Sequence, residues 1–136
     1  MDVDTATKRL QAYFESHCEG VACVYLFGSV ARGTAHGRSD ADVAVLLDRD
    51  PPATLTGSSI SLAGELERVL GCEVDVVVLN RAPVDLLHRV LRDGRVVFDP
   101  RPAERIRFEV RARNAYFDLK PILDRYRRVT PAPAHG

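Results

Sequence analysis

The sequence predicts an α/β or α+β fold, in which a small mixed sheet is flanked by helices and followed by a C-terminal helical tail. Short apolar runs rich in β-branched residues alternate with segments whose apolar residues recur at helical spacing. Residues 28–39 are too few to hold a full crossover helix between the first two strands, which allows that pair to be antiparallel. The 136 residues fit one domain with a substantial core.

The N-terminal third contains one helix and two strands. A helix is predicted over residues 4–17, with Asp4 as its candidate N-cap. The run VACVYLF predicts a strand over 21–27, and 28–39 should form a loop with room for one helical turn. Residues 40–47, DADVAVLL, predict a second strand that is apolar on both faces beyond its aspartates, as is typical of a central strand.

The middle of the chain continues the alternation. Pro51-Pro52 and the Thr/Ser/Gly residues after them predict a loop, and a helix marked by apolar positions from residue 60 should end at Gly71. Residues 72–79, CEVDVVVL, predict a third buried strand. A short helix that begins at Pro83 and ends at Gly94 is expected next, followed by a fourth strand over 95–98.

A long helical pattern begins at Ala103 and contains Pro121, which should either kink the helix or start a new one. The last seven residues, TPAPAHG, have the composition of a disordered end. We therefore expect a folded domain over 1–100, a helical tail over 101–129 that packs on the domain or on a partner, and a disordered segment over 130–136.

The composition narrows the class of protein. Hydrophobic residues make up 46% of the chain and charged residues 28%, as in ordinary globular proteins. No apolar run has the length of a membrane span, and the polar N-terminus does not resemble a signal peptide, so a cytoplasmic location is expected. The three cysteines include no CxxC pair, which argues against a disulfide framework or a zinc site.

The net charge is zero but is unevenly distributed along the chain. Residues 1–100 carry a net charge of −5 and residues 101–136 a net charge of +5. A nucleic-acid-binding domain would be strongly basic as a whole, so direct nucleic-acid binding is not expected. The basic C-terminal part is either a solvated helix face or a surface for an acidic partner.

Two aspartates at the start of the second predicted strand require an explanation. Asp40 and Asp42 point to the same side, because side chains alternate along a strand. Two adjacent carboxylates repel each other, and Mg²⁺, which prefers carboxylates, phosphates and water, would resolve that repulsion. Asp75 lies within another apolar strand. If the two strands are neighbours, the three carboxylates converge, as two-metal phosphoryl chemistry requires.

The loop before these aspartates suits a phosphate. Gly28 lets the backbone approach an anion closely, Ser29 offers a hydroxyl and an N–H, and Arg32 carries a guanidinium. Taken singly, each residue has a simpler interpretation: a strand-end turn, a surface arginine, or an acid facing solvent from an edge strand. A Walker A lysine and a GxGxxG fingerprint are both missing. The joint order and spacing therefore favour a site.

The string GSVARGTAHGRSDADVAVLL resembles the minimal nucleotidyltransferase (MNT) branch of the DNA polymerase β superfamily, whose pattern is Gly-Ser, about ten residues, Asp-x-Asp and a later acid. The segment EVRARNAYFDLKPILDRYRR is also similar to the tail of MNT antitoxins that are encoded beside HEPN-domain toxins. The resemblance implies a polymerase β-like nucleotidyltransferase fold. It also implies an enzyme that uses ATP and Mg²⁺.

The resemblance assigns roles to individual residues. It implies that three carboxylates are both catalytic and metal-binding, namely Asp40, Asp42 and Asp75. It implies that four further residues bind the nucleotide, namely Gly28, Ser29, Arg32 and Ser39. The reaction implied for this branch is transfer of AMP from ATP to a tyrosine of a HEPN RNase toxin, which makes the protein an antitoxin. The resemblance also leaves room for an oligomer formed through the toxin.

Two alternative functions stay open at this stage. One is a non-catalytic antitoxin that neutralises its toxin by binding, with Tyr116, Phe117 and Tyr126 of the tail as the interface. The other is a small-molecule nucleotidyltransferase of the type that modifies aminoglycosides. The acceptor residue, the number of AMP units, the base preference and the oligomeric state are not encoded in the motif.

Overall fold

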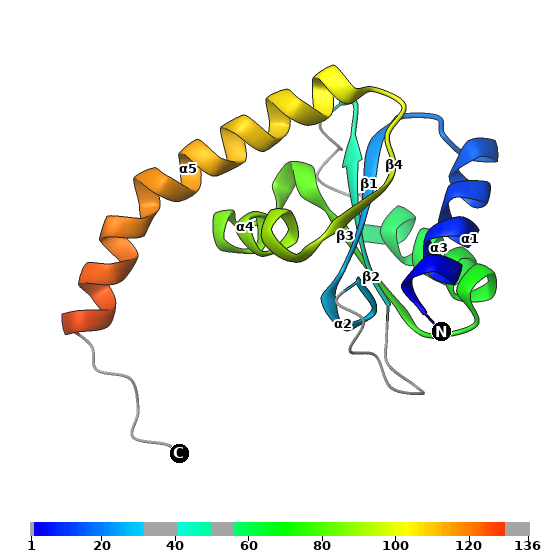
Figure 1. The fold of residues 1–136 in the computed structure, drawn as a ribbon, viewed down its shortest axis with the longest axis horizontal. Coiled ribbons are helices and arrows are strands. Elements are labelled where there is room, and N and C mark those ends of the chain that lie inside the picture. The colour runs from blue at the N-terminus through cyan, green and yellow to red at the C-terminus, as the bar shows by residue number, and fades with distance from the viewer. Residues whose placement is uncertain (1, 32–40, 50–55, 130–136) are drawn as a thin grey trace, which may run out of the picture.

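The chain forms three layers in a computed structural model that describes residues 2–31, 41–49 and 56–129, with a four-stranded mixed sheet between two layers of helices (Figure 1). The predicted α/β class with a mixed sheet is confirmed. The elements in chain order are α1 (Val3–Ser16), β1 (Val21–Phe27), α2 (Gly28–Ala31), β2 (Ala41–Leu47), α3 (Thr56–Leu70), β3 (Val74–Val78), the 3-10 turn η1 (Leu79–Arg81), α4 (Val84–Asp93), β4 (Arg95–Phe98) and α5 (Pro102–Val129).

Two predicted helix starts were wrong by a few residues. The N-cap of α1 is Asp2, whose carboxylate accepts a hydrogen bond from the Thr5 N–H at 2.7 Å, and Asp4 lies in the first turn. Helix α3 begins at Thr56, within the Thr/Ser/Gly stretch that was predicted to be a loop. Thr, Ser and Gly are common where helices begin, so such a stretch fits a helix start as well as a loop.

The strand order is β3-β2-β1-β4. Strand β1 pairs antiparallel with both β2 and β4, whereas β2 and β3 are parallel. The prediction of a buried third strand was wrong, because β3 is at the edge of the sheet and only Val74 among its five residues is buried. An apolar run does not reveal whether a strand has one neighbour or two.

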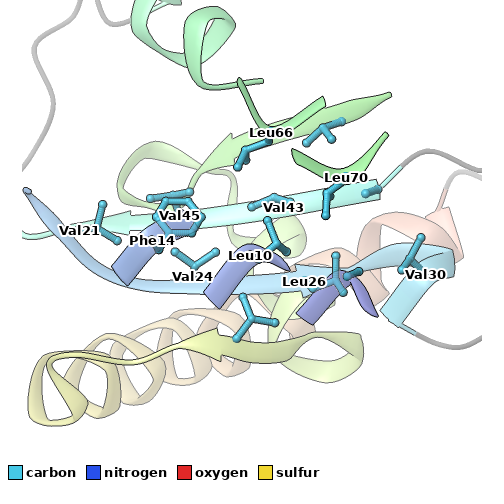
Figure 2. Close-up of a cluster of buried hydrophobic side chains, with 14 residues drawn as sticks. Leu10, Phe14, Val21, Val24, Leu26, Val30, Val43, Val45, Leu66 and Leu70 are labelled. Carbon is cyan, nitrogen blue, oxygen red and sulfur yellow. The ribbon is translucent and has the colours of Figure 1, made fainter. Parts of the chain in front are cut away.

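Each face of the sheet is covered by its own pair of helices. On one face, α1 and α3 pack on β1 and β2 through Leu10, Phe14 and Leu66, among others (Figure 2). On the opposite face, α4 and α5 cover Tyr25 and Ala44, among other side chains. The sheet is therefore buried on both sides along its two central strands, β1 and β2.

Helix α5 is continuous over 28 residues, with Pro121 inside it. Of the two outcomes predicted for Pro121, the start of a new helix does not occur, and Figure 1 shows the helix changing direction in its C-terminal part, as the predicted kink requires. No helix within the described residues is long and apolar enough to cross a membrane. The segment 130–136, which was predicted to be disordered, lies outside the described residues.

Candidate functional site

The candidate site begins where β1 ends against the start of β2. Phe27, the last residue of β1, pairs with Asp42 of β2, and Gly28 follows with a φ of 77°. A Cβ at position 28 would collide with the Asp42 carboxylate and would lie 3.0 Å from its Cγ. The backbone turn therefore requires glycine for two reasons: its left-handed conformation disfavours other residues, and the Asp42 carboxylate leaves no room for a Cβ.

Asp42 and Asp75 lie side by side on the sheet. They are partners in the parallel register of β2 and β3, so their side chains leave the same face of the sheet from strands about 4.8 Å apart. Asp42 is half-buried and Asp75 is exposed. The structure thus brings together two of the three predicted carboxylates and makes their strands neighbours, as the proposed convergence requires.

The remaining predicted residues are only partly described. Ser29 lies in α2 directly after Gly28, so the helical turn allowed for in this loop is present. Asp40, Arg32 and Ser39 lie outside the described residues. Within the described ranges, no group of three His, Cys, Asp or Glu side chains is placed to hold a metal ion, and the predicted set includes the undescribed Asp40.

The described residues fit a hard divalent cation. Two carboxylates from neighbouring strands share one face, and one of them is held against the Gly28 backbone. Oxygen donors of this kind suit Mg²⁺, which keeps several waters and commonly bridges protein carboxylates to substrate phosphates. Such a site would relieve the repulsion between the neighbouring carboxylates of Asp42 and Asp75.

A polar network lies on the same face of the sheet, under α5, and was not predicted. The Tyr25 hydroxyl donates to Glu109 Oε2 at 2.6 Å, and Arg105 contacts the same oxygen at 3.2 Å and Asp99 Oδ2 at 3.0 Å. Burial and the hydrogen bond to Glu109 raise the pKa of Tyr25 above its ordinary value. Burial also raises the pKa of Cys23 to about 12. No local pattern could reveal contacts between residues 84 positions apart.

A cavity between α4 and α5 was also missed. It has a volume of about 260 Å³, and its walls come from His88, Leu91, Arg92, Arg113, Tyr116 and Phe117. The rings of His88 and Tyr116 stack with their centroids 3.6 Å apart and their planes 4° apart. The sequence placed Tyr116 and Phe117 in the tail as candidate interface residues but gave no sign that α4 would lie against them.

Known proteins are similar to this chain in sequence and in architecture. The family model described as "Polymerase beta, Nucleotidyltransferase" matches residues 8–102, which include Gly28, Asp42 and Asp75. A protein adenylyltransferase MntA from Shewanella oneidensis is 33% identical over 119 residues, which are 82% of this chain and 81% of that protein.

Two solved structures have the same fold. The crystal structure of a toxin–antitoxin with AMP-PNP superposes with a TM-score of 0.71 at 24% identity, covering 88% of this chain and 97% of that one. A complex of the tri-AMPylated HEPN toxin of Shewanella oneidensis with its MNT antitoxin gives a TM-score of 0.67 at 20% identity, with 91% and 98% coverage. The coverages of 97% and 98% show that the likeness extends over nearly the whole length of each matched chain.

Proposed function

The chain belongs to the polymerase β nucleotidyltransferase family, and from that premise we propose that it transfers AMP from ATP to a tyrosine of a cognate HEPN-class RNase toxin and so acts as its antitoxin. The observation that supports this proposal most directly is the register that sets Asp42 beside Asp75, with Gly28 packed against the Asp42 carboxylate. Metal-dependent transfer at phosphorus needs carboxylates and a close backbone approach at one place.

The proposed roles of the site residues follow from the family resemblance and, for Gly28, Asp42 and Asp75, also from their place in the sheet. Gly28 and Ser29 bind the phosphates of ATP beside the Asp42 carboxylate, and Arg32 and Ser39 also bind the nucleotide. Asp40, Asp42 and Asp75 would hold Mg²⁺. When bound, Mg²⁺ would neutralise charge that develops on the phosphate oxygens.

The chemical step is an in-line displacement at the α-phosphorus of ATP. The acceptor hydroxyl oxygen forms a bond to this phosphorus, and the bond from the phosphorus to the bridging oxygen of the β-phosphate breaks. Pyrophosphate leaves with that bonding pair. We propose that Asp75 takes the proton of the hydroxyl, which its exposure at the sheet edge supports.

The partner and location are proposed on separate grounds. The similar protein from Shewanella oneidensis is named a protein adenylyltransferase, and structures with this fold contain an antitoxin with a HEPN toxin. A protein acceptor is consistent with both. We also propose a cytoplasmic location, because ATP is the substrate and the three cysteines are free thiols.

The central experiment incubates the purified chain with its toxin, ATP and Mg²⁺ and follows the intact mass of the toxin. We expect mass increments of one or more AMP units with the native chain. Asp42→Asn, which is nearly isosteric, should abolish them, and the matched control Asp4→Asn, an exposed change in the first turn of α1, should not. An unmodified toxin after incubation with the native chain would contradict the proposal.

Neutralisation by binding alone is the second candidate, because α5 exposes apolar side chains at Phe117, Ile122 and Tyr126. The Asp42→Asn variant separates the two functions in cells that express the toxin. Loss of protection at native expression level supports catalysis. Full protection by a variant that transfers no AMP supports neutralisation by binding.

A further inference from the structure

Helix α5 consists of two parts with different surroundings. Its N-terminal part packs on the sheet through Phe108 and Ala112, which are both buried. A helix of 28 residues is about 42 Å long, and Figure 1 shows its C-terminal part continuing beyond α4, away from the sheet. We call residues 113–129 the distal half of α5.

The distal half exposes large apolar side chains. Phe117, Ile122 and Tyr126 are 65%, 58% and 66% exposed. Exposed apolar residues are normal when scattered, but these three lie on one helix segment, and Phe117 also lines the cavity between α4 and α5. Pro121 also removes a backbone hydrogen bond in this segment, so its helical form has less support of its own.

The cavity has the composition of an anchoring pocket. Its walls combine the stacked rings of His88 and Tyr116 with apolar Leu91 and two arginine side chains. Tyrosine and arginine are enriched among the residues that contribute most to protein–protein binding, particularly where an apolar side chain enters a pocket. The cavity therefore suits an apolar side chain whose neighbours are acidic.

The cavity between α4 and α5 lies on the same side of the sheet as the candidate site. Asp42 lies two residues before Ala44 in β2, and Asp75 lies two residues before Val77 in β3, so each aspartate shares a face of the sheet with its neighbour. Ala44 and Val77 pack in the core under α4 and α5. Helix α4 contacts both α5 and α2, and α2 begins at Gly28. A protein seated at the corner between α4 and α5 would therefore lie over the face from which the carboxylates project.

The charge of the distal half selects the kind of partner. Residues 113–128 contain five Arg or Lys and two Asp or Glu. The complementary surface is apolar with an acidic rim. Charge of this kind accelerates association and fixes orientation more than it adds affinity.

We propose that the cavity between α4 and α5, together with the distal half of α5, is the docking surface for the protein that accepts AMP. This inference rests on the proposed function, since it takes the acceptor as the occupant. The acceptor inserts an apolar side chain into the cavity and lays an acid-rimmed apolar surface along the distal half. A second copy of this chain is a poorer occupant, because it would cover the carboxylate face that the acceptor must reach.

The test measures AMP transfer to the acceptor and acceptor binding for a double variant, Ile122→Asp with Tyr126→Asp. We expect the KM for the acceptor and the Kd of the complex to rise at least about tenfold, with kcat at saturation and binding of Mg²⁺·AMP-PNP unchanged. The matched control, Ile106→Asp with Val110→Asp, alters two exposed apolar residues in the N-terminal part of α5 and should leave all four values unchanged. Both variants change exposed positions, so both should fold.

A milder variant gives a second test. Arg125→Glu should weaken acceptor binding about threefold at low salt, with the difference disappearing at high salt. An unchanged KM and Kd in the Ile122/Tyr126 variant would overturn the proposal. So would a dimer of the chain alone that this variant converts to a monomer. If the native chain binds the toxin but transfers no AMP, the proposed function fails, while the Kd comparison still tests the docking surface.

Discussion

The packed body of the molecule and the distal half of α5 have opposite properties. In the body, Gly28 has no room for a Cβ, and Tyr25 is bound by Glu109 beneath α5. In the distal half, Phe117 and Tyr126 are about two-thirds exposed and Pro121 interrupts the backbone hydrogen bonding. Packing positions the chemistry in the first region, whereas the second region keeps its side chains accessible.

The difference indicates a division of roles. A transfer site needs its carboxylates held within a fraction of an ångström, which a buried sheet and close backbone contact provide. A docking surface needs exposed apolar area, which is compatible with few internal contacts. Substitutions in the two regions should accordingly have separable effects, and the following predictions are ordered from the largest expected effect to the smallest.

Gly28→Ala should reduce AMP transfer by at least about 100-fold, because the added Cβ displaces the Asp42 carboxylate and the left-handed φ of 77° disfavours alanine. Initial rates of toxin modification measure this effect. Gly71→Ala is the matched control, since Gly71 also has a positive φ of 74° but no atom within 4 Å of its added Cβ. A Gly28→Ala enzyme as active as that control would contradict the close approach to Asp42.

Phe108→Ala should lower the free energy of unfolding by about 3 kcal/mol, because it leaves a cavity under the N-terminal part of α5, where Phe108 is buried. Phe117→Ala, on the same helix but exposed, should change that free energy by less than about 0.5 kcal/mol. Urea unfolding of the two variants compares them directly. Equal losses would show that the distal half is as firmly packed as the body.

Alkaline pH should destabilise the body through Tyr25 and Cys23. Their pKa values are raised from 10.0 and 9.0 in the folded chain, so the unfolded chain loses these protons at lower pH. The stabilisation is complete below pH 9 and falls as the pH rises above 9 and then 10. Unfolding free energies measured across this range should fall less steeply for Tyr25→Phe. An unchanged slope in that variant would contradict the assignment to Tyr25.

Pro121→Ala should produce the smallest change in global stability, below about 0.5 kcal/mol, while it increases amide protection in the distal half. Alanine restores a helical hydrogen bond, but the large apolar side chains on both sides of Pro121 are exposed rather than packed on the body. Hydrogen exchange resolved along the chain measures the local effect, and thermal unfolding measures the global one. A clear rise in global stability would show that the distal half is coupled to the sheet.

Much of the fold was predictable from the sequence because it depends on local patterns. Apolar periodicity located α1, α3, α4, α5 and the four strands within a few residues, but not the 3-10 turn η1. The short segment 28–39 allowed the antiparallel pairing of β1 with β2. The errors came from ambiguous signals. The apolar run at 72–79 did not show that β3 is an edge strand, and the Ser/Thr stretch did not distinguish a loop from the first turn of α3.

The candidate site, like the fold, could be predicted from the sequence only in part. The sequence singled out Gly28, Asp42 and Asp75 as candidates, because their spacing is short or their charge is unusual within an apolar strand. The structure brings these three positions together, while their roles stay predictions. The assignment of Arg32, Ser39 and Asp40 stays a prediction, since these residues lie outside the described part of the chain. The pairing of Asp42 with Asp75 needed the strand order, which no local pattern encodes.

The sequence by itself supplied the candidate chemistry: a glycine that admits a close backbone approach, carboxylates of the kind that suit a divalent cation, and a basic C-terminal helix with apolar positions. The tertiary structure decided how these parts are combined. It placed Asp75 in register with Asp42, set α4 against α5 to form the cavity, and turned both features to one face of the sheet. Contacts between distant residues depend on which elements become neighbours, and that choice is made by packing of the whole chain rather than by any segment alone.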